Sequence, residues 1–130
     1  RSPFYLPDAM TLKVLSELNF SYDSSKTIFK PAYCSRVRVK MMRSVIPSKI
    51  EDILEIPVTG DYTYNLKNFN FYDSLKQALR DFDWIKSRNG VFVLNNHPNH
   101  VDLKVLFAFL RVLISRISHK TDFMRLKDLV

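Results

Sequence analysis

Glycine is scarce in this chain of 130 residues, where only Gly60 and Gly90 occur. Loops that cradle phosphate groups and turns that bind dinucleotides need several glycines at set offsets, and two isolated glycines cannot supply them. The sequence therefore argues against nucleotide-dependent catalysis within these residues.

Cysteine is rarer, because Cys34 is the only one and an internal disulfide is excluded. A single cysteine fits a reducing compartment, so we expect a cytoplasmic or nuclear protein. The chain starts at Arg1 without the pattern of a signal peptide, and we interpret it as a piece of a larger protein. The apolar run from Val105 to Leu110 is flanked by charged residues and is far shorter than the roughly 20 residues that cross a bilayer, so we expect no membrane partner.

The sequence also lacks the patterns of common catalytic sites. His97 and His100 are the only closely spaced histidines, and a metal ion would need two more ligands that the lone cysteine and a distant third histidine supply poorly. No G-x-S-x-G motif occurs, and carboxylate pairs such as Glu51-Asp52 are more simply explained as helix ends. We therefore expect no cofactor, no metal and no enzymatic activity.

Positive charge is what the chain has in surplus, with 20 Lys and Arg against 13 Asp and Glu and a formal net charge of +7. Such a balance favours anionic partners such as nucleic acid, although the basic residues are spread along the whole chain. The length suits one domain with a sizeable core.

The clearest local pattern begins at Asn70, which can cap a helix. Phe71, Leu75, Leu79 and Phe82 then recur at helical spacing and give this helix one apolar face. The dipeptide Asn89-Gly90 follows between two extended runs and predicts a type I′ hairpin.

Alternation along this predicted hairpin sorts its side chains into a core face with Ile85, Phe92 and Leu94, and an exposed face with Trp84, Lys86, Arg88 and Val93. A helix followed by a basic hairpin is typical of a winged helix, in which the hairpin is the wing. The alternative is another small α+β domain in which Arg36 to Met41 forms a sheet strand.

The segments before this helix are predicted from weaker signals. Residues 35–46 fit a strand or a helix, and we favour a helix because such a length without a breaker is unusual for a strand. Ser48 and Glu51 match a capping box, which predicts another short helix. Residues 1–7 suggest an extended arm, and Asp8 can cap a short helix after it.

A long helix is predicted from about Asn99 to Ser118. Its leucines alternate three and four residues apart, as in a seam between packed helices, and apolar residues cover most of its circumference. Such a helix is either wholly buried or has a partner. We expect Leu103, Leu106 and Leu110 to face the core, and Lys104, Phe107, Arg111 and Ile114 to form a contact surface.

The order of these elements resembles the LOTUS or OST-HTH domain, a small winged helix of germline RNA-granule proteins such as Oskar and certain Tudor-domain proteins. The resemblance covers residues 35–95 and rests mainly on TGDYTYNLKNFNFYDSLKQALRD followed by DWIKSRNGVFVL. It implies a place in cytoplasmic RNA granules. In extended LOTUS domains a helix after the wing helps to dock the DEAD-box helicase Vasa, and residues 99–118 are similar in position; other members are reported as RNA binders.

These patterns together predict a single α+β domain of winged-helix type. We expect an N-terminal arm and short helix in residues 1–34, a winged-helix core in 35–95 and a helical extension in 96–130. The leading functional expectation is a non-enzymatic protein-interaction module that docks a DEAD-box helicase or a second copy of the chain through its last helix. The alternative is an RNA-binding, less readily a DNA-binding, domain whose basic face and wing contain Arg36, Arg38, Lys40, Arg43, Lys49, Trp84, Lys86 and Arg88.

Overall fold

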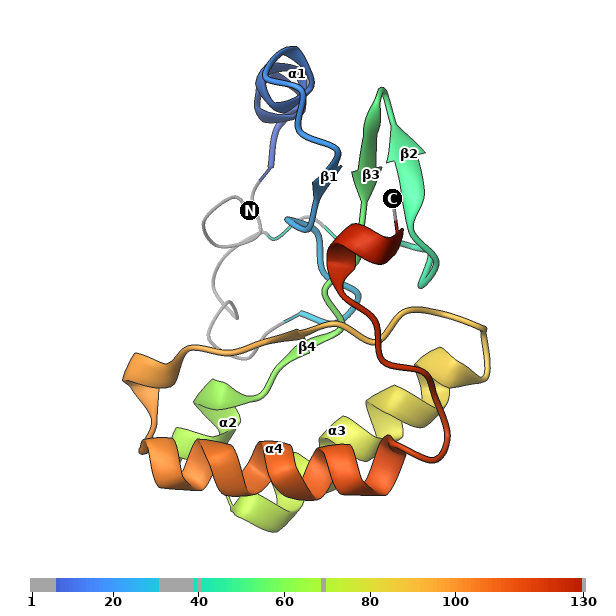
Figure 1. The fold of residues 1–130 in the computed structure, drawn as a ribbon. Coiled ribbons are helices and arrows are strands. Elements are labelled where there is room, and N and C mark those ends of the chain that lie inside the picture. The colour runs from blue at the N-terminus through green and yellow to red at the C-terminus, as the bar shows by residue number, and fades with distance from the viewer. Residues whose placement is uncertain (1–6, 31–38, 40, 69, 130) are drawn as a thin grey trace.

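Two groups of secondary-structure elements lie one above the other in Figure 1. The structure is a computed structural model that describes residues 7–30, 39, 41–68 and 70–129. Its upper group holds α1 and strands β1 to β3, and its lower group holds α2 to α4 with β4 and β5 along its upper side. This mixture of helices and small sheets confirms the predicted α+β class. The elements are α1 Ala9–Glu17, β1 Tyr22–Asp23, β2 Ser48–Ile50, β3 Ile53–Glu55, β4 Gly60–Asp61, α2 Thr63–Asn68, α3 Phe71–Lys86, β5 Leu94–Asn95, η3 Pro98–His100, α4 Leu103–Ile117 and η4 Leu126–Leu129.

The upper strands form a mixed sheet in the order β1-β3-β2. β1 runs parallel to β3 and places Asp23 opposite Glu55. β2 and β3 are antiparallel, with Ile50 opposite Ile53, so the chain reverses within two residues. The last residues of β1 and β3 therefore carry neighbouring carboxylates.

β4 and β5 form a second, parallel pair in which Asp61 lies opposite Asn95. The chain between these strands passes through α2 and α3, which is the crossover connection that a parallel pair requires. The carboxyl ends of the two strands consequently lie at the same edge.

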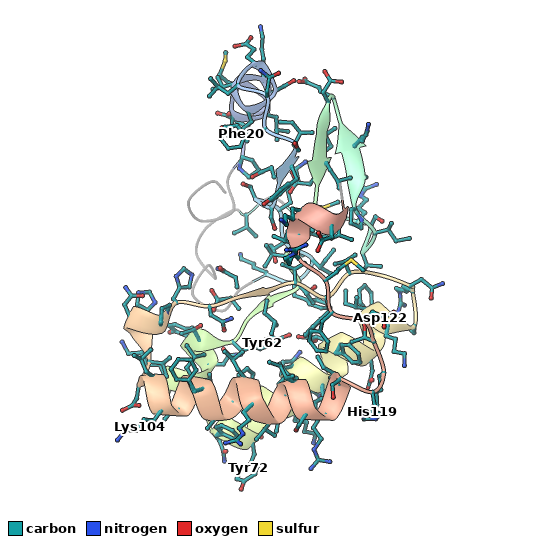
Figure 2. The ribbon with its side chains drawn as sticks, in the orientation of Figure 1. Phe20, Tyr62, Tyr72, Lys104, His119 and Asp122 are labelled. Atoms are coloured by element: carbon teal, nitrogen blue, oxygen red, sulfur yellow. The ribbon has the colours of Figure 1, made fainter. Side chains whose placement is uncertain are left out.

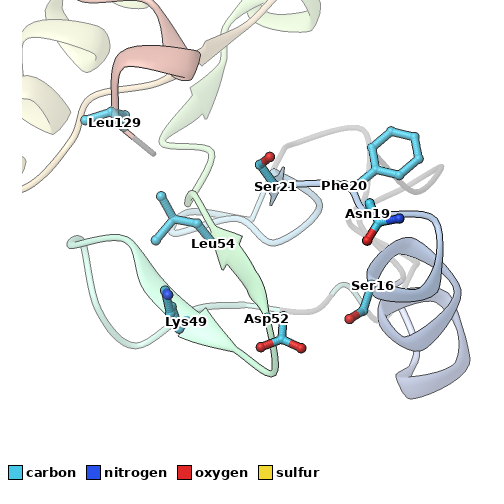
Figure 3. Close-up of a pocket in the computed structure, with 8 residues that line it drawn as sticks. All are labelled: Ser16, Asn19, Phe20, Ser21, Lys49, Asp52, Leu54 and Leu129. Atoms are coloured by element: carbon cyan, nitrogen blue, oxygen red, sulfur yellow. The ribbon is translucent and has the colours of Figure 1, made fainter.

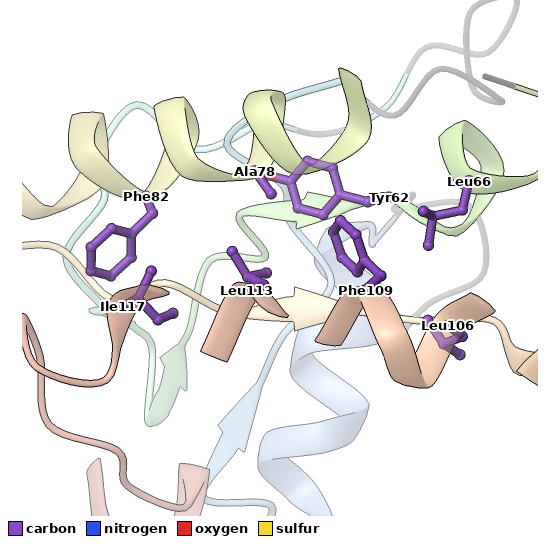
Figure 4. Packing of buried hydrophobic residues seen from close by; sticks show 8 residues of the cluster. All are labelled: Tyr62, Leu66, Ala78, Phe82, Leu106, Phe109, Leu113 and Ile117. Atoms are coloured by element: carbon purple, nitrogen blue, oxygen red, sulfur yellow. The ribbon is translucent and has the colours of Figure 1, made fainter. Parts of the chain in front are cut away.

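An apolar core lies between α3, α4 and the residues that follow β4 (Figure 4). Phe109 is completely buried at its centre, with ring centroids 6.0 Å from Tyr62 and 6.1 Å from Phe71. Leu75 and Leu79 pack against this cluster, as the helical spacing predicted. The buried members are Tyr62, Leu66, Ala78, Phe82, Leu106, Phe109, Leu113 and Ile117.

A smaller apolar cluster of Ile28, Val45 and Ile85 lies at the C-terminal end of α3. The backbone of Gly90 packs against it so closely that a Cβ atom there would lie 2.5 Å from Cγ2 of Val45 and 2.9 Å from Cγ2 of Ile85. Gly90 is therefore required for close packing and not for a positive φ.

The hairpin predicted at Asn89-Gly90 is not formed, because α3 continues to Lys86. Asn89 does have a positive φ of 51°, but it ends a helix. The N–H of Gly90 donates to the carbonyl oxygen of Ile85, and the N–H of Asn89 donates to that of Lys86. This Schellman arrangement satisfies the last carbonyl groups of α3. The predicted wing, with Trp84, Lys86, Arg88 and Val93 on one exposed strand face, is therefore wrong.

Two helices predicted before α2 are also wrong where the structure describes them. Ser48 begins β2 instead of capping a helix, and Glu51, with φ at 55°, lies in the turn to β3. Residues 41–46 form no helix, and Met41 pairs with Thr27 in a single parallel bridge. Burial of alternate side chains in β3 outweighs the local capping signal here. Arg36, Arg38 and Lys40 lie outside the described residues.

The first and last predicted helices are present with slightly different limits. Asp8 caps α1, where its Oδ1 accepts the N–H of Thr11 at 2.7 Å. α4 begins later than predicted, because Pro98–His100 forms a 3-10 turn and Asp102 is the N-cap, accepting the N–H of Lys104 at 2.7 Å.

Candidate protein-interaction surface

α4 is held in place by one buried side. Leu106, Phe109, Leu113 and Ile117 are all no more than 4% exposed, and their spacing of three or four residues puts them on one stripe of the helix. This stripe packs against the core residues of α3 and against Tyr62. The direction in which the rest of the helix surface faces is therefore fixed.

The outer side of α4 carries three large apolar side chains in the open. Leu103, Phe107 and Ile114 are 51%, 64% and 45% exposed, and their spacing of four and seven residues aligns them along the helix. We call these three residues the α4 ridge. Phe107 and Ile114 were predicted to be available for contact, whereas the prediction that Leu103 faces the core is wrong. Phe109 is buried in the core instead of Leu103, because the buried stripe runs along a different line of the helix from the one that was predicted.

Two cationic side chains lie beside the α4 ridge. Lys104 and Arg111 are both exposed, and their spacing of seven residues puts them on a line next to the ridge (Lys104 is labelled in Figure 2). The α4 sequence LKVLFAFLRVLISRI also contains Arg116 and no acidic residue. The outer side of α4 is therefore both apolar and positively charged.

The residues predicted to bind nucleic acid come from separate places in the described structure. Lys49 lies on β2 in the upper group, whereas Lys86 and Arg88 lie at the end of α3 in the lower group. Arg43 is exposed in the segment before β2. Because α3 continues through Lys86, these residues are not arranged as a wing beside a helix.

Trp84 was predicted to be available for stacking on a base. It is 38% exposed, but the guanidinium carbon of Arg88 lies 4.0 Å from its ring centroid, and the Phe29 ring centroid lies 5.3 Å away. The indole ring therefore already has partners within the molecule.

Sequence reasoning missed a polar cluster at the carboxyl ends of β4 and β5. The carboxylate of Asp61 is fully buried, and its Oδ2 lies 3.0 Å from Nε2 of His97 and 3.2 Å from Nδ2 of Asn95. The signal available was the HPNH motif, which was considered only as a metal site and set aside for lack of further ligands, and a carboxylate more than thirty residues earlier was not considered as its partner.

A second cluster that the sequence did not reveal lies at the ends of β1 and β3. Glu55 is fully buried, its Oε1 accepts the N–H groups of Ser25 and Lys26, and its Oε2 lies 3.6 Å from Nζ of Lys26 without a hydrogen bond. Burial raises the pKa of Glu55, and the nearby Asp23 acts in the same direction. The carboxylate fixes the loop after β1 to the end of β3.

A cleft of about 520 Å³ opens between α1, the β2–β3 hairpin and the C-terminal segment (Figure 3). Phe20, Leu54 and Leu129 supply its apolar walls, and Lys49 and Asp52 its charged side chains. A neighbouring cleft of about 660 Å³ shares Phe20 and extends along Leu15, Leu18 and Leu126.

Neither a protein-family model, nor a curated protein, nor a solved structure matches this chain. In the described part, no three His, Cys, Asp or Glu side chains are grouped so as to hold a metal ion. Likewise, none of the described helices is long and apolar enough to cross a membrane.

Proposed function

We propose that this protein is a protein-interaction module whose α4 ridge docks an amphipathic helix that carries acidic residues beside its apolar stripe. The observation that supports this proposal is the exposure of Leu103, Phe107 and Ile114 in a line along a helix whose other side is fixed by the core. A row of large apolar side chains exposed to water is costly unless a partner covers it.

The spacing of the α4 ridge suits a helix as the partner. Apolar side chains at i, i+4 and i+11 form a ridge that fits between the side chains of a second helix. Phe107 lies near the middle of the ridge, where a large aromatic side chain contributes most to binding.

Charge favours a different protein over a second copy of this chain. Lys104 and Arg111 flank the ridge. In a symmetric pairing of two α4 helices the same surface of both copies would meet, so the cations of one copy would lie near those of the other and repel them. An acidic partner would gain from the same two residues, in the rate of association more than in affinity.

The resemblance to LOTUS domains makes a lobe of a DEAD-box RNA helicase the first partner to test. It would also place the protein in RNA granules of the cytoplasm. This part of the proposal rests on the sequence resemblance over residues 35–95 and on the position of α4 after it.

A photo-crosslinking residue placed at Phe107 tests the surface directly. Phe123 is the matched control, because it is a phenylalanine of similar exposure, 61%, outside α4. We expect adducts with one acidic helical segment from position 107 and none from position 123, and we expect Lys104→Glu with Arg111→Glu to slow their formation. Calorimetry with a purified helicase lobe then measures affinity.

Equal adducts from both positions would contradict the proposal. So would full binding by a folded Phe107→Glu, Ile114→Glu variant. Sedimentation of the wild type should show a monomer, and a dimer that these two substitutions dissociate would make a second copy the partner.

RNA binding remains the second candidate, supported by the exposed Lys86 and Arg88 in and just after the last turn of α3. Replacing both by alanine should weaken binding of single-stranded RNA and reduce its salt dependence. Unchanged affinity and salt dependence would remove this candidate.

A further inference from the structure

The C-terminal segment returns from the lower part of the molecule to the upper part (Figure 1). It leaves α4 after Ile117 and ends in the 3-10 turn η4, Leu126–Leu129. Leu126 and Leu129 are half-buried, whereas every other residue from 121 to 129 is exposed. Leu129 lines the cleft of about 520 Å³, and Leu126 lines the neighbouring cleft of about 660 Å³. These two leucines are therefore the residues through which the segment meets the clefts.

The turn presents both leucines on one side, because side chains three residues apart eclipse each other in a 3-10 helix. A different side carries an ion pair in which Nε and Nη2 of Arg125 donate to Oδ2 and Oδ1 of Asp128 at 2.9 and 3.0 Å. The N–H of Asp128 also donates to the carbonyl oxygen of Arg125. The turn is thus a small folded unit with one apolar and one charged side.

The contact between this turn and the clefts is apolar. Across the described part of the chain, the hydrogen bonds and the ion pair of residues 121–129 all join residues within that segment. The hydrophobic effect is not directional, so another ligand that offers the same apolar side chains can replace the two leucines. The turn is therefore displaceable.

The walls of the clefts are fixed by hydrogen bonds, in contrast to the turn that lies against them. Asn19 ends α1 with a φ of 58°, and the N–H of Phe20 then donates to the carbonyl oxygen of Leu15 at 3.0 Å. The N–H of Leu54 on β3 donates to the carbonyl oxygen of Ser21 at 3.1 Å. Phe20 lines both clefts, and these bonds join its loop to α1 and to β3 (Figure 3).

We propose that the two clefts bind a short turn with two leucines three residues apart, and that η4 is a tethered competitor that occupies them until a partner segment of the same pattern displaces it. This inference is independent of the α4 ridge. The chemistry of the partner follows from the observed contact of Leu126 and Leu129, with apolar side chains toward the clefts and charged ones toward solvent. A tethered segment has an effective concentration of about a millimolar, so a free ligand must compete with it.

A peptide with the sequence HKTDFMRLKDLV, which is that of residues 119–130, serves as the probe. Fluorescence anisotropy of the labelled peptide measures its affinity for the full chain and for a Leu126→Asp, Leu129→Asp variant of it. We expect this double variant to bind the peptide about 10-fold more tightly than the wild type does, because its own turn no longer competes. A control peptide in which aspartate replaces both leucines should not bind to either protein.

A third substitution in the double variant tests which surface binds the peptide. Phe20→Asp should weaken binding about 10-fold, because it places a charge in the apolar wall that both clefts share. Phe107→Asp is the matched control, since Phe107 is 64% exposed on α4 and Phe20 is 53% exposed. It should leave the affinity unchanged, which separates this site from the α4 ridge. Circular dichroism checks that each variant is folded.

Three results would overturn the proposal. The first is equal affinity of the folded double variant and the wild type for the peptide. The second is full binding after Phe20→Asp, or binding of the control peptide as tight as that of the probe. The third is a wild-type dimer in sedimentation that the double variant does not form, because the turn would then occupy the clefts of a second copy.

Discussion

The lower and upper parts of the molecule are held together by different chemistry. The lower part packs hydrocarbon side chains of α3 and α4 around Phe109. The upper part buries polar side chains around the ends of β1 and β3, among them Asp23, Ser24, Ser25, Thr27 and Glu55. Apolar burial gains free energy roughly with area, whereas buried polar groups are tolerated only while their hydrogen bonds are made. The lower part should therefore respond to changes of volume, and the upper part to the loss of a single acceptor.

Removing the central ring of the lower core should have the largest effect. Phe109→Ala should lower the free energy of unfolding by about 3–5 kcal/mol, because it leaves a cavity where two aromatic rings now make contact. Leu103→Ala on the exposed side of the same helix should cost less than about 0.5 kcal/mol. Urea denaturation measures both, and similar losses would mean that α4 is not oriented as described.

Removing the acceptor in the upper part should come next. Glu55→Ala should lower the free energy of unfolding by about 2–3 kcal/mol, because it leaves the buried N–H groups of Ser25 and Lys26 without their acceptor. Glu55→Gln keeps an acceptor oxygen and should lose less than half of that. If the two variants are equally unstable, the carboxylate matters through its charge and not as an acceptor.

Changing pH should affect both parts through one carboxyl group in each. Burial raises the pKa of Glu55 and of Asp81, although the hydroxyl of Tyr62 donates to Oδ2 of Asp81 at 2.6 Å. Each carboxyl group is easier to protonate in the folded protein than in the unfolded chain, where the pKa values are 4.5 for Glu55 and 3.8 for Asp81. The stability that each protonated group contributes is therefore fully present below its unfolded pKa and is lost as the pH rises through its folded pKa. Asp81→Asn and Glu55→Gln should each flatten this decline, as urea titrations from acid to neutral pH would show. Asp128→Asn is the control, because the adjacent Arg125 lowers the pKa of that exposed carboxyl and the decline should persist.

The smallest effect on stability is expected from substitutions at the C-terminal ends of two helices, α1 in the upper part and α3 in the lower part. α1 and α3 both stop at an asparagine with positive φ, Asn19 at 58° and Asn89 at 51°. Asn19→Gly and Asn89→Gly should each raise the free energy of unfolding by about 0.5 kcal/mol, since glycine adopts this conformation without steric cost. A loss of stability in either variant would show that the asparagine side chain matters there. Thermal denaturation of the pair is sufficient.

The same division explains what the sequence could and could not predict. Apolar residues at regular spacing identify long helices, so the presence of α3 and α4 was predicted, and Leu75, Leu79 and Phe82 of α3 and Leu106 of α4 do belong to the core. The caps Asn70, Asp102 and Asp8 act within three residues and were also recognisable or nearly so. Leu103 was wrongly predicted to face the core because the leucines were taken to form the buried stripe, whereas the buried stripe includes Phe109 and leaves Leu103 exposed.

The upper part was predicted poorly because its strands have only two or three residues. No alternation can be recognised over such a length, and Ser48 with Glu51 imitated a helix start. The Asn89-Gly90 signal failed in an instructive way, because positive φ at Asn89 was right and its use in a hairpin was wrong. Positive φ serves a helix end as well as a turn, and the choice was made by the packing of Gly90 on Val45.

The Asp61–His97 cluster was beyond local reasoning for a related cause. Asp61 and Asn95 are 34 residues apart and meet only because β4 and β5 pair. Two-residue strands give no signal of their own, so nothing in the sequence indicated that this carboxylate and this imidazole are neighbours.

The parallel pairing of β4 with β5 has a consequence for the order of folding. α3 and α4 can each form from local contacts, whereas Asp61 can meet Asn95, 34 positions later, only after the segment between them has closed into a loop. Each strand contributes only two residues, so the pair is too small to close that loop unaided. We expect the helices to dock first and the strands to join afterwards. In a kinetic experiment the imidazole of His97 would then acquire its carboxylate partner in a late step, after the helical signal has already recovered.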